Sequence, residues 1–369
     1  MNKKRINVTR SSMPPFEEYI EELKPVWESR WLTNRGMATV KLEELLKDYL
    51  KVEKICCFAS GHVALEVAIN GLFLPKGAEV ITTPYTFCST THAIVRNNLV
   101  PVFVDIEEKT YTINPELIEQ AITEKTVAIV ATHVYGFPCN VEAIEKIARK
   151  HNLVVVYDAA HAFGVEYKGV GIGNYGDLTM FSTHATKVFH TIEGGIVTYK
   201  SRDAERFDPM NKMVNFGLTS HEDITYVGTN ARINEFEAVM GICNLRHVDE
   251  EIAKRKAATE RYWERLDGVK GICLPKPGAD VKWNYIYFPV FFDGYRMDRN
   301  QVQAKLSEEN IYARKYFYPI TNEAACYVDQ YGDADVPVSR HAADTVLTLP
   351  MFADLTTDDV DRICDIILH

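Results

Sequence analysis

Short apolar runs alternate with amphipathic stretches along the first 200 residues. Seven runs, rich in β-branched residues, predict strands at 55–58, 80–82, 100–104, 127–131, 154–157, 179–181 and 196–199. Between them, apolar positions recur at helical spacing over 63–72, 115–123 and 141–151, and Asn114-Pro115 is a typical helix start. Strands that alternate with helices predict a mostly parallel sheet with helices on both faces.

The pattern changes after residue 230. A long amphipathic segment at 233–266, rich in Glu, Lys and Arg, predicts one helix that leads into a smaller C-terminal unit. In that unit, 283–292 predicts a strand, 299–309 predicts a helix, and 354–359 predicts the cap of a final helix. The predicted domains are residues 1–250, with the N-terminal segment and the large sheet, and residues 251–369, with an α+β fold.

Composition narrows the class of protein. With 369 residues and 46% hydrophobic content, the chain can bury one large core and one smaller core. A net charge of −10 argues against a nucleic-acid partner, and neither a membrane span nor a signal peptide is predicted. Eight cysteines without Cys-x-x-Cys spacing predict reduced thiols and a cytoplasmic location.

Two residues carry candidate chemistry. Lys187 lies between Ser182 and a Glu-Gly-Gly turn, among small and apolar residues that would desolvate its amine and make it a better nucleophile. Asp158 follows the apolar run 153–157, and ligands gather at the carboxyl ends of such buried strands. A solvated loop lysine and an ordinary turn aspartate are the alternatives for each residue alone.

The Lys187 segment and the motif Asp158-Ala-Ala-His161 together resemble the DegT/DnrJ/EryC1/StrS family of sugar aminotransferases, which use pyridoxal phosphate (PLP). The resemblance implies that Lys187 holds PLP and transfers protons as general acid and base. It implies that Asp158 keeps the pyridine nitrogen protonated and that His161 binds the phenolic oxygen. No metal site is predicted.

A phosphate site is predicted where the strand at 55–58 turns into the next helix. Ser60 and Gly61 form the small-residue turn that places backbone N–H groups at a helix N-terminus. The family usually has threonine where this chain has His62, so one hydroxyl is missing. By the same resemblance, Ser182 binds the phosphate and can replace that hydroxyl.

Two further segments resemble the family. In Pro84-Tyr-Thr-Phe87 the resemblance assigns Phe87, in preference to Tyr85, to the face of the cofactor ring. In the segment 228–235 it assigns Asn230 to the phosphate of a neighbouring subunit, which implies a homodimer with shared sites; the alternative is that Asn230 caps the following helix. Residues 312–319 also resemble the family, but continue with Ile-Thr where relatives commonly have Leu-His.

The resemblance implies a fold-type I, aspartate-aminotransferase-like enzyme with a mixed, mainly parallel seven-stranded sheet. We expect it to move an amino group from L-glutamate to a nucleotide-linked 4-keto-6-deoxy sugar. The motif at 158–161 and the segments at 10–15 and 31–34 resemble family members that act on dTDP-4-keto-6-deoxyglucose for O-antigen synthesis, so the resemblance favours this substrate. A 3-keto sugar aminotransferase, a PLP-dependent sugar dehydratase and a non-catalytic PLP-binding or nucleotide-sugar-binding regulator remain alternatives. A Rossmann dehydrogenase is disfavoured because no Gly-x-Gly-x-x-Gly follows the first strand.

Overall fold

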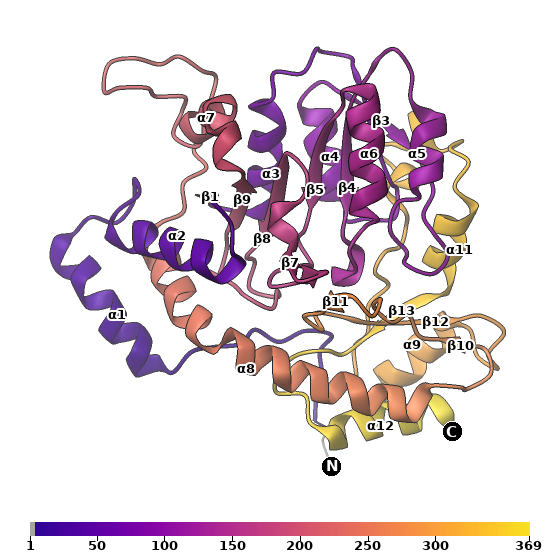
Figure 1. Cartoon of the computed structure of the whole chain (residues 1–369). Helices are drawn as coiled ribbons and strands as arrows, with labels where there is room; N and C mark the ends of the chain where they lie inside the picture. Colours follow the sequence, from indigo (N-terminus) through magenta and orange to yellow (C-terminus); the bar gives the residue numbers. More distant parts are fainter. Residues whose placement is uncertain (1–3) are drawn as a thin grey trace.

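A seven-stranded sheet forms the centre of the larger part of the protein, in a computed structural model that describes residues 4–369 (Figure 1). Six strands are parallel, and only β9 runs against its neighbours. All seven strands predicted in this region are confirmed. In their order across the sheet they are β1 (Lys54–Phe58), β9 (Gly195–Tyr199), β8 (Leu178–Ser182), β5 (Val154–Asp158), β4 (Thr126–Thr132), β2 (Glu79–Thr82) and β3 (Val100–Phe103).

Successive strand residues point to opposite faces, and each face has its own core. Val80 and Val156 pack into the core of one face, whereas their neighbours Ile81 and Tyr157 pack into the core of the other. The first face is covered by α3 (Gly61–Asn70), α4 (Cys88–Arg96) and α7 (Ala204–Met213). The second is covered by α2 (Met37–Leu50), α5 (Pro115–Ala121), α6 (Val141–His151) and the start of α8 (Glu235–Leu266). Outside them, α1 (Phe16–Ser29) packs on α8.

The predicted long helix is confirmed as α8, which runs from the large sheet to a smaller unit below it (Figure 1). There α8 packs with a three-stranded antiparallel sheet and two helices. Because α8 continues unbroken through residue 250, the domain boundary at that residue stays a prediction. The elements of this unit are β10 (Ile272–Cys273), β12 (Phe288–Phe292), β13 (Val346–Leu349), α9 (Arg299–Glu308), α10 (Val328–Tyr331), α11 (Pro337–Thr345) and α12 (Thr357–Leu368).

The strand predicted over 283–292 is wrong in its first half. Only β12 is extended there, and Tyr285 adopts a left-handed conformation with φ of 54°. Trp283 and Asn284 instead form side-chain hydrogen bonds with the backbone carbonyls of Tyr135 and His161. The segment before β12 therefore holds the C-terminal unit against the large sheet. Directly before this segment, β11 (Val281–Lys282) pairs with β6 (Glu166–Tyr167), which pairs with β7 (Val170–Gly171) in a third, small sheet.

Candidate active site

A cavity of about 390 Å³ lies where several parallel strands end. Residues at or just after the ends of β1, β2, β4, β5 and β8 contribute to its wall, because the carboxyl ends of parallel strands share one edge of a sheet. Eight of the nine residues proposed from the sequence line this cavity. They are Ser60, Gly61, His62, Phe87, Asp158, His161, Ser182 and Lys187.

Asp158, the last residue of β5, is a buried carboxyl group with a donor on each oxygen. Thr90 Oγ1 donates to Oδ2 at 2.7 Å, and the backbone N–H of Ala160 donates to Oδ1 at 3.0 Å. Burial raises the pKa of Asp158, and these two hydrogen bonds and the charge of Lys187 oppose that rise. The two donors therefore hold the carboxylate in one orientation. Because burial disfavours its ionised form, a nearby positive charge would stabilise it.

Lys187 lies in the loop between β8 and β9 and extends into the same cavity. Burial lowers its pKa to about 8, although the carboxylate of Asp158 opposes this shift. Its Nζ lies 5.8 Å from the centre of the Tyr287 ring. The lowered pKa makes the neutral, nucleophilic form of the amine more accessible near neutral pH than in a solvated lysine.

His161 is a neutral imidazole whose tautomer follows from its partner. Its Nδ1 accepts the backbone N–H of Tyr135 at 3.1 Å, so the ring proton is on Nε2. Burial and the charge of Lys187 lower the pKa of His161 well below 6.5. The ring stacks on Phe317 with centroids 5.7 Å apart and 6° between the planes. His161 can therefore donate a hydrogen bond from Nε2.

The N-terminus of α3 forms one end of the cavity. Ser60 caps this helix and receives the N–H groups of Val63 and Ala64, so those of Gly61 and His62 remain for a ligand. A Cβ atom on Gly61 would lie 2.8 Å from the Cβ of Ser182, so glycine is required for β8 to approach. The His62 ring is hydrogen-bonded to Ser89, with 2.9 Å between Nδ1 and Oγ.

The aromatic residues after β2 differ in position. Phe87 lines the cavity and has 58% of its surface exposed. Tyr85 is fully buried, and its hydroxyl is hydrogen-bonded to that of Tyr135. Of the two candidates, only Phe87 is placed where it can contact a bound ring.

Sequence reasoning assigned no role to the four cavity residues from the C-terminal part of the chain: Tyr287, Arg314, Tyr316 and Phe317. The aromatic run 312–319 was the available signal. Arg314 lies with its guanidinium 5.1 Å from the centre of the Tyr316 ring, and no carboxylate among residues 4–369 forms a salt bridge with it. At the position where relatives have histidine, Thr321 is buried and accepts a hydrogen bond from Thr91, outside the cavity wall.

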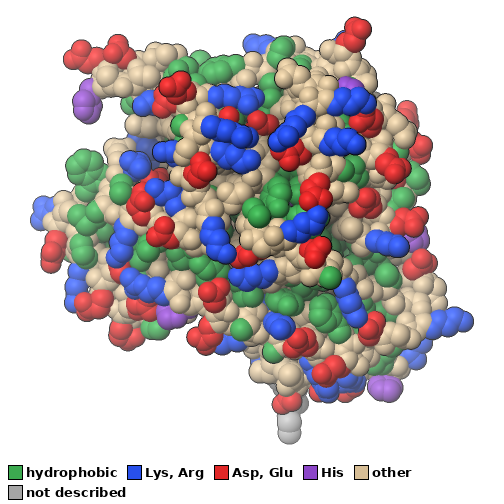
Figure 2. Space-filling model, in the orientation of Figure 1, with side chains coloured by type: hydrophobic (Ala, Val, Ile, Leu, Met, Phe, Trp, Pro, Cys, Tyr) green, Lys and Arg blue, Asp and Glu red, His purple; other side chains and the backbone are tan. Residues whose placement is uncertain are grey.

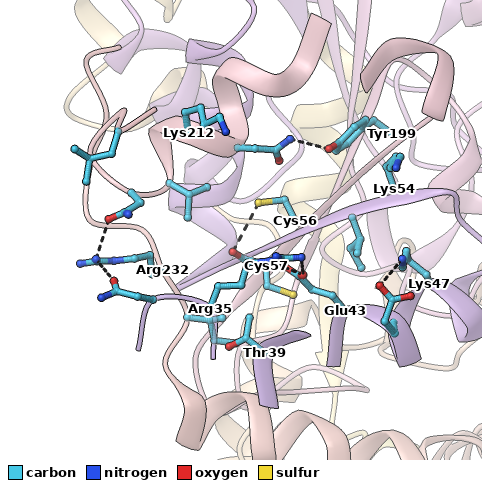
Figure 3. A pocket seen from close by; sticks show the side chains of 18 residues that line it. Arg35, Thr39, Glu43, Lys47, Lys54, Cys56, Cys57, Tyr199, Lys212 and Arg232 are labelled. Carbon is cyan, nitrogen blue, oxygen red and sulfur yellow. Dashed lines mark hydrogen bonds and ion pairs between the residues drawn. The ribbon is translucent and has the colours of Figure 1, made fainter. Parts of the chain in front are cut away.

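Asn230 does not line this cavity. Its side-chain oxygen accepts hydrogen bonds from Nε and Nη2 of Arg232, at 3.1 and 2.7 Å. Arg232 in turn lines a second pocket of about 600 Å³ beside the edge strand β1, among Arg35, Glu43 and Lys212 (Figure 3). The helix-cap alternative is wrong, because Asn234 caps α8 in a capping box. Asn230 is therefore an exposed side chain with a fixed orientation.

Comparisons with known proteins agree with this geometry. A model of the DegT/DnrJ/EryC1/StrS aminotransferase family matches residues 16–368. A dTDP-4-amino-4,6-dideoxy-D-glucose transaminase of Shigella dysenteriae is 40% identical to this chain, over 98% of both chains. A transaminase of the same name from Escherichia coli is 38% identical, over 100% of this chain and 99% of the other. The solved structure of DesI with its TDP-sugar product is 30% identical, with a TM-score of 0.92 over 98% of this chain and 92% of that one.

Proposed function

Because the chain belongs to the DegT/DnrJ/EryC1/StrS aminotransferase family, we propose that it uses PLP to transfer an amino group from L-glutamate to a nucleotide-linked 4-keto-6-deoxy sugar. The observation that carries this proposal is the pairing of the buried Lys187 and Asp158 side chains in one cavity. The two transaminases and DesI favour a dTDP-linked sugar, dTDP-4-keto-6-deoxy-D-glucose.

The residues present fit PLP at three points. The free N–H groups of Gly61 and His62, with the nearby Ser182, suit a phosphate dianion. The buried carboxylate of Asp158 suits a cationic ring nitrogen. Between these points, Lys187 is within the cavity and partly neutral, as a lysine that must bond to an aldehyde carbon requires.

When bound, PLP supplies an electron sink for the carbon that loses its proton. Lys187 then acts as general base and general acid, moving one proton at the substrate carbon, and its lowered pKa places both protonation states within reach at neutral pH. The carboxylate of Asp158 would keep the ring nitrogen protonated. His161 would donate a hydrogen bond from Nε2 to the phenolic oxygen. Arg314, which has no carboxylate partner among the described residues, binds an anionic group of a substrate.

The proposal includes a homodimer in which Asn230 of one subunit reaches the phosphate site of the other. Exposed apolar side chains occur in the segments next to this residue, over 216–227, and in and just after α1. They are Phe16, Trp27, Trp31, Phe216, Ile224 and Val227, each with at least 46% of its surface exposed. Figure 2 shows hydrophobic side chains at the left edge of the molecule, over the region of α1. Apolar surface of this extent favours a protein partner.

The first experiment tests cofactor and reaction together. Purified protein with PLP should show the visible absorbance of lysine-bound PLP, and Lys187→Ala should lose it. Glutamate alone should convert the cofactor to its amine form, and dTDP-4-keto-6-deoxyglucose should then yield an amino sugar. A deoxygenated product without nitrogen would indicate a dehydratase. A cofactor spectrum that no amino acid changes would indicate a non-catalytic binding protein.

The second experiment tests the shared site. Lys187→Ala and Asn230→Ala subunits, each impaired alone, are mixed under conditions that exchange subunits. If the site is shared, each mixed dimer has one intact site, and activity recovers to about a quarter of the wild-type value. If Asn230 serves its own subunit, every mixed dimer has two damaged sites and nothing is recovered.

A further inference from the structure

Three buried threonine hydroxyls connect the motif that carries Phe87 to the carboxylate of Asp158. Thr86 Oγ1 lies 2.9 Å from Thr90 Oγ1 and 3.0 Å from Thr132 Oγ1. Thr90 Oγ1 lies 2.7 Å from Asp158 Oδ2. The three threonines come from the turn after β2, from α4 and from the end of β4, and each is at most 3% exposed. Their hydroxyls therefore form one continuous chain that ends at Asp158.

The direction of each hydrogen bond follows from the number of protons. A hydroxyl has one proton to donate, and a carboxylate only accepts. The Thr90 proton therefore goes to Asp158, so Thr86 must donate to Thr90, and Thr132 must donate to Thr86. All three O–H dipoles point toward the carboxylate, and hydrogen bonds aligned in this way polarise one another.

We propose that Thr132, Thr86 and Thr90 are positioning residues that stabilise the ionised form of Asp158 and fix the orientation of its carboxylate. The proposal rests on the proposed function, in which Asp158 faces a cationic ring nitrogen. Burial raises the pKa of Asp158, and the hydrogen bond from Thr90 is the largest interaction that lowers it. The titratable side chains that interact electrostatically with Asp158 are Lys187 and Cys139.

The test uses the protein without PLP, so that it does not depend on activity. Thr90→Val keeps the side-chain shape but removes the hydroxyl, and Thr90→Ser restores the hydroxyl. Thr82→Val is the matched control, because Thr82 is fully buried on β2 and its Oγ1 has no hydrogen-bond partner among residues 4–369. Unfolding by denaturant is measured for each variant at pH 8 and toward pH 5.

Because burial raises the pKa of Asp158, the folded state holds the proton of this group more tightly than the unfolded chain does. The stability that this proton contributes is lost as the pH rises through the folded pKa. Without the Thr90 hydroxyl the pKa of Asp158 rises further, so the loss at pH 8 grows. We expect the folding equilibrium constant of Thr90→Val to fall about 10-fold or more at pH 8, and by less toward pH 5. Thr90→Ser should recover most of the loss, and Thr82→Val should change little.

An equal loss at both pH values, the same loss in Thr82→Val, or no recovery in Thr90→Ser would overturn the proposal. If Thr90→Val does not fold, Thr86→Val and Thr86→Ser replace it, with a smaller effect of the same pH dependence expected. The proposed function fails separately: a wild-type protein that binds no PLP refutes it, whatever the threonine variants show.

Discussion

At the scale of single residues, burial decides the ionisation of the groups in the cavity. It lowers the pKa of Lys187 to about 8, raises that of Asp158 and keeps His161 neutral. Each shift suits a separate chemical role. Lys187 can lose its proton near neutral pH, and the carboxylate of Asp158 is stabilised by a cation. His161 can donate a hydrogen bond from Nε2. Burial of these charged groups also costs free energy, so it lowers the stability of the folded protein without PLP.

The pKa of Lys187 gives a prediction about stability. Below about pH 8 the lysine is charged in both states, and the folded state bears the full cost of the buried charge. Above 10.5, the value in the unfolded chain, it is neutral in both states and that cost is absent. In the absence of PLP, the unfolding free energy of Lys187→Met relative to wild type should therefore be higher at pH 7 than at pH 10.5, by about 3 kcal/mol.

Chemical denaturation across this pH range measures the difference, and Lys76→Met, at an exposed position, is the control. A difference between Lys187→Met and wild type that does not change with pH would show that the amine is solvated.

At the scale of elements, one buried carboxylate joins the start of α2 to the start of α8. Glu235, fully buried in the first turn of α8, accepts the backbone N–H groups of Gly36, Ala38 and Thr39, and the hydroxyl of Thr39. It thereby caps α2 with a residue almost 200 positions away in sequence.

Glu235→Gln replaces an oxygen acceptor with an N–H donor that faces other donors. We expect a loss of about 2–3 kcal/mol in the free energy of unfolding, because hydrogen bonds to a buried charged group are broken. Faster hydrogen exchange should be confined to the first turn of α2. Glu237→Gln, in the capping box of α8, is the control, since glutamine can still accept the N–H of Asn234. Equal losses in both variants would contradict the tie between the two helices.

At the scale of the whole molecule, the cavity is built jointly by the large sheet and the C-terminal unit. Tyr287, Arg314, Tyr316 and Phe317 line it together with residues from the strand ends. Exposed apolar residues outside the cavity wall occur over 216–227, next to Asn230 in the chain, and along α1. In the proposed dimer, this surface is buried and brings Asn230 to the partner's phosphate site.

A charge on this surface should oppose dimer formation. Val227 is 88% exposed and Ile224 is 72% exposed, so Val227→Asp with Ile224→Asp should fold normally as a monomer. Burial of the new charges in an interface is costly, so we expect dimer dissociation and weaker PLP retention. Sedimentation measures the first and equilibrium dialysis the second. The double variant Val170→Asp and Val328→Asp, at exposed positions elsewhere, is the control. An unchanged assembly would exclude the 224–227 segment from the interface.

The periodicity of the sequence by itself determined the seven strands of the large sheet, the helices α3, α5 and α6 between them, and α8, because each depends on local hydrophobic pattern. The positions of Ser60, Asp158 and Ser182 at strand ends were predictable for the same reason: strands of a parallel sheet end at a common edge. The small and apolar residues around Lys187 indicated its chemistry, and family motifs added His161 and Phe87; the structure gathers all three in the same cavity.

Only the tertiary structure decided what depends on contacts between distant segments. It placed Arg314, Tyr316 and Phe317 in the cavity wall and turned residues 283–287 from a predicted strand into a packed connection. It also aligned the hydroxyls of Thr132, Thr86 and Thr90 on Asp158. These features arise where side chains from separate elements meet within hydrogen-bonding or packing distance. A local pattern contains no information on which distant side chains will meet, so only the folded chain reveals them.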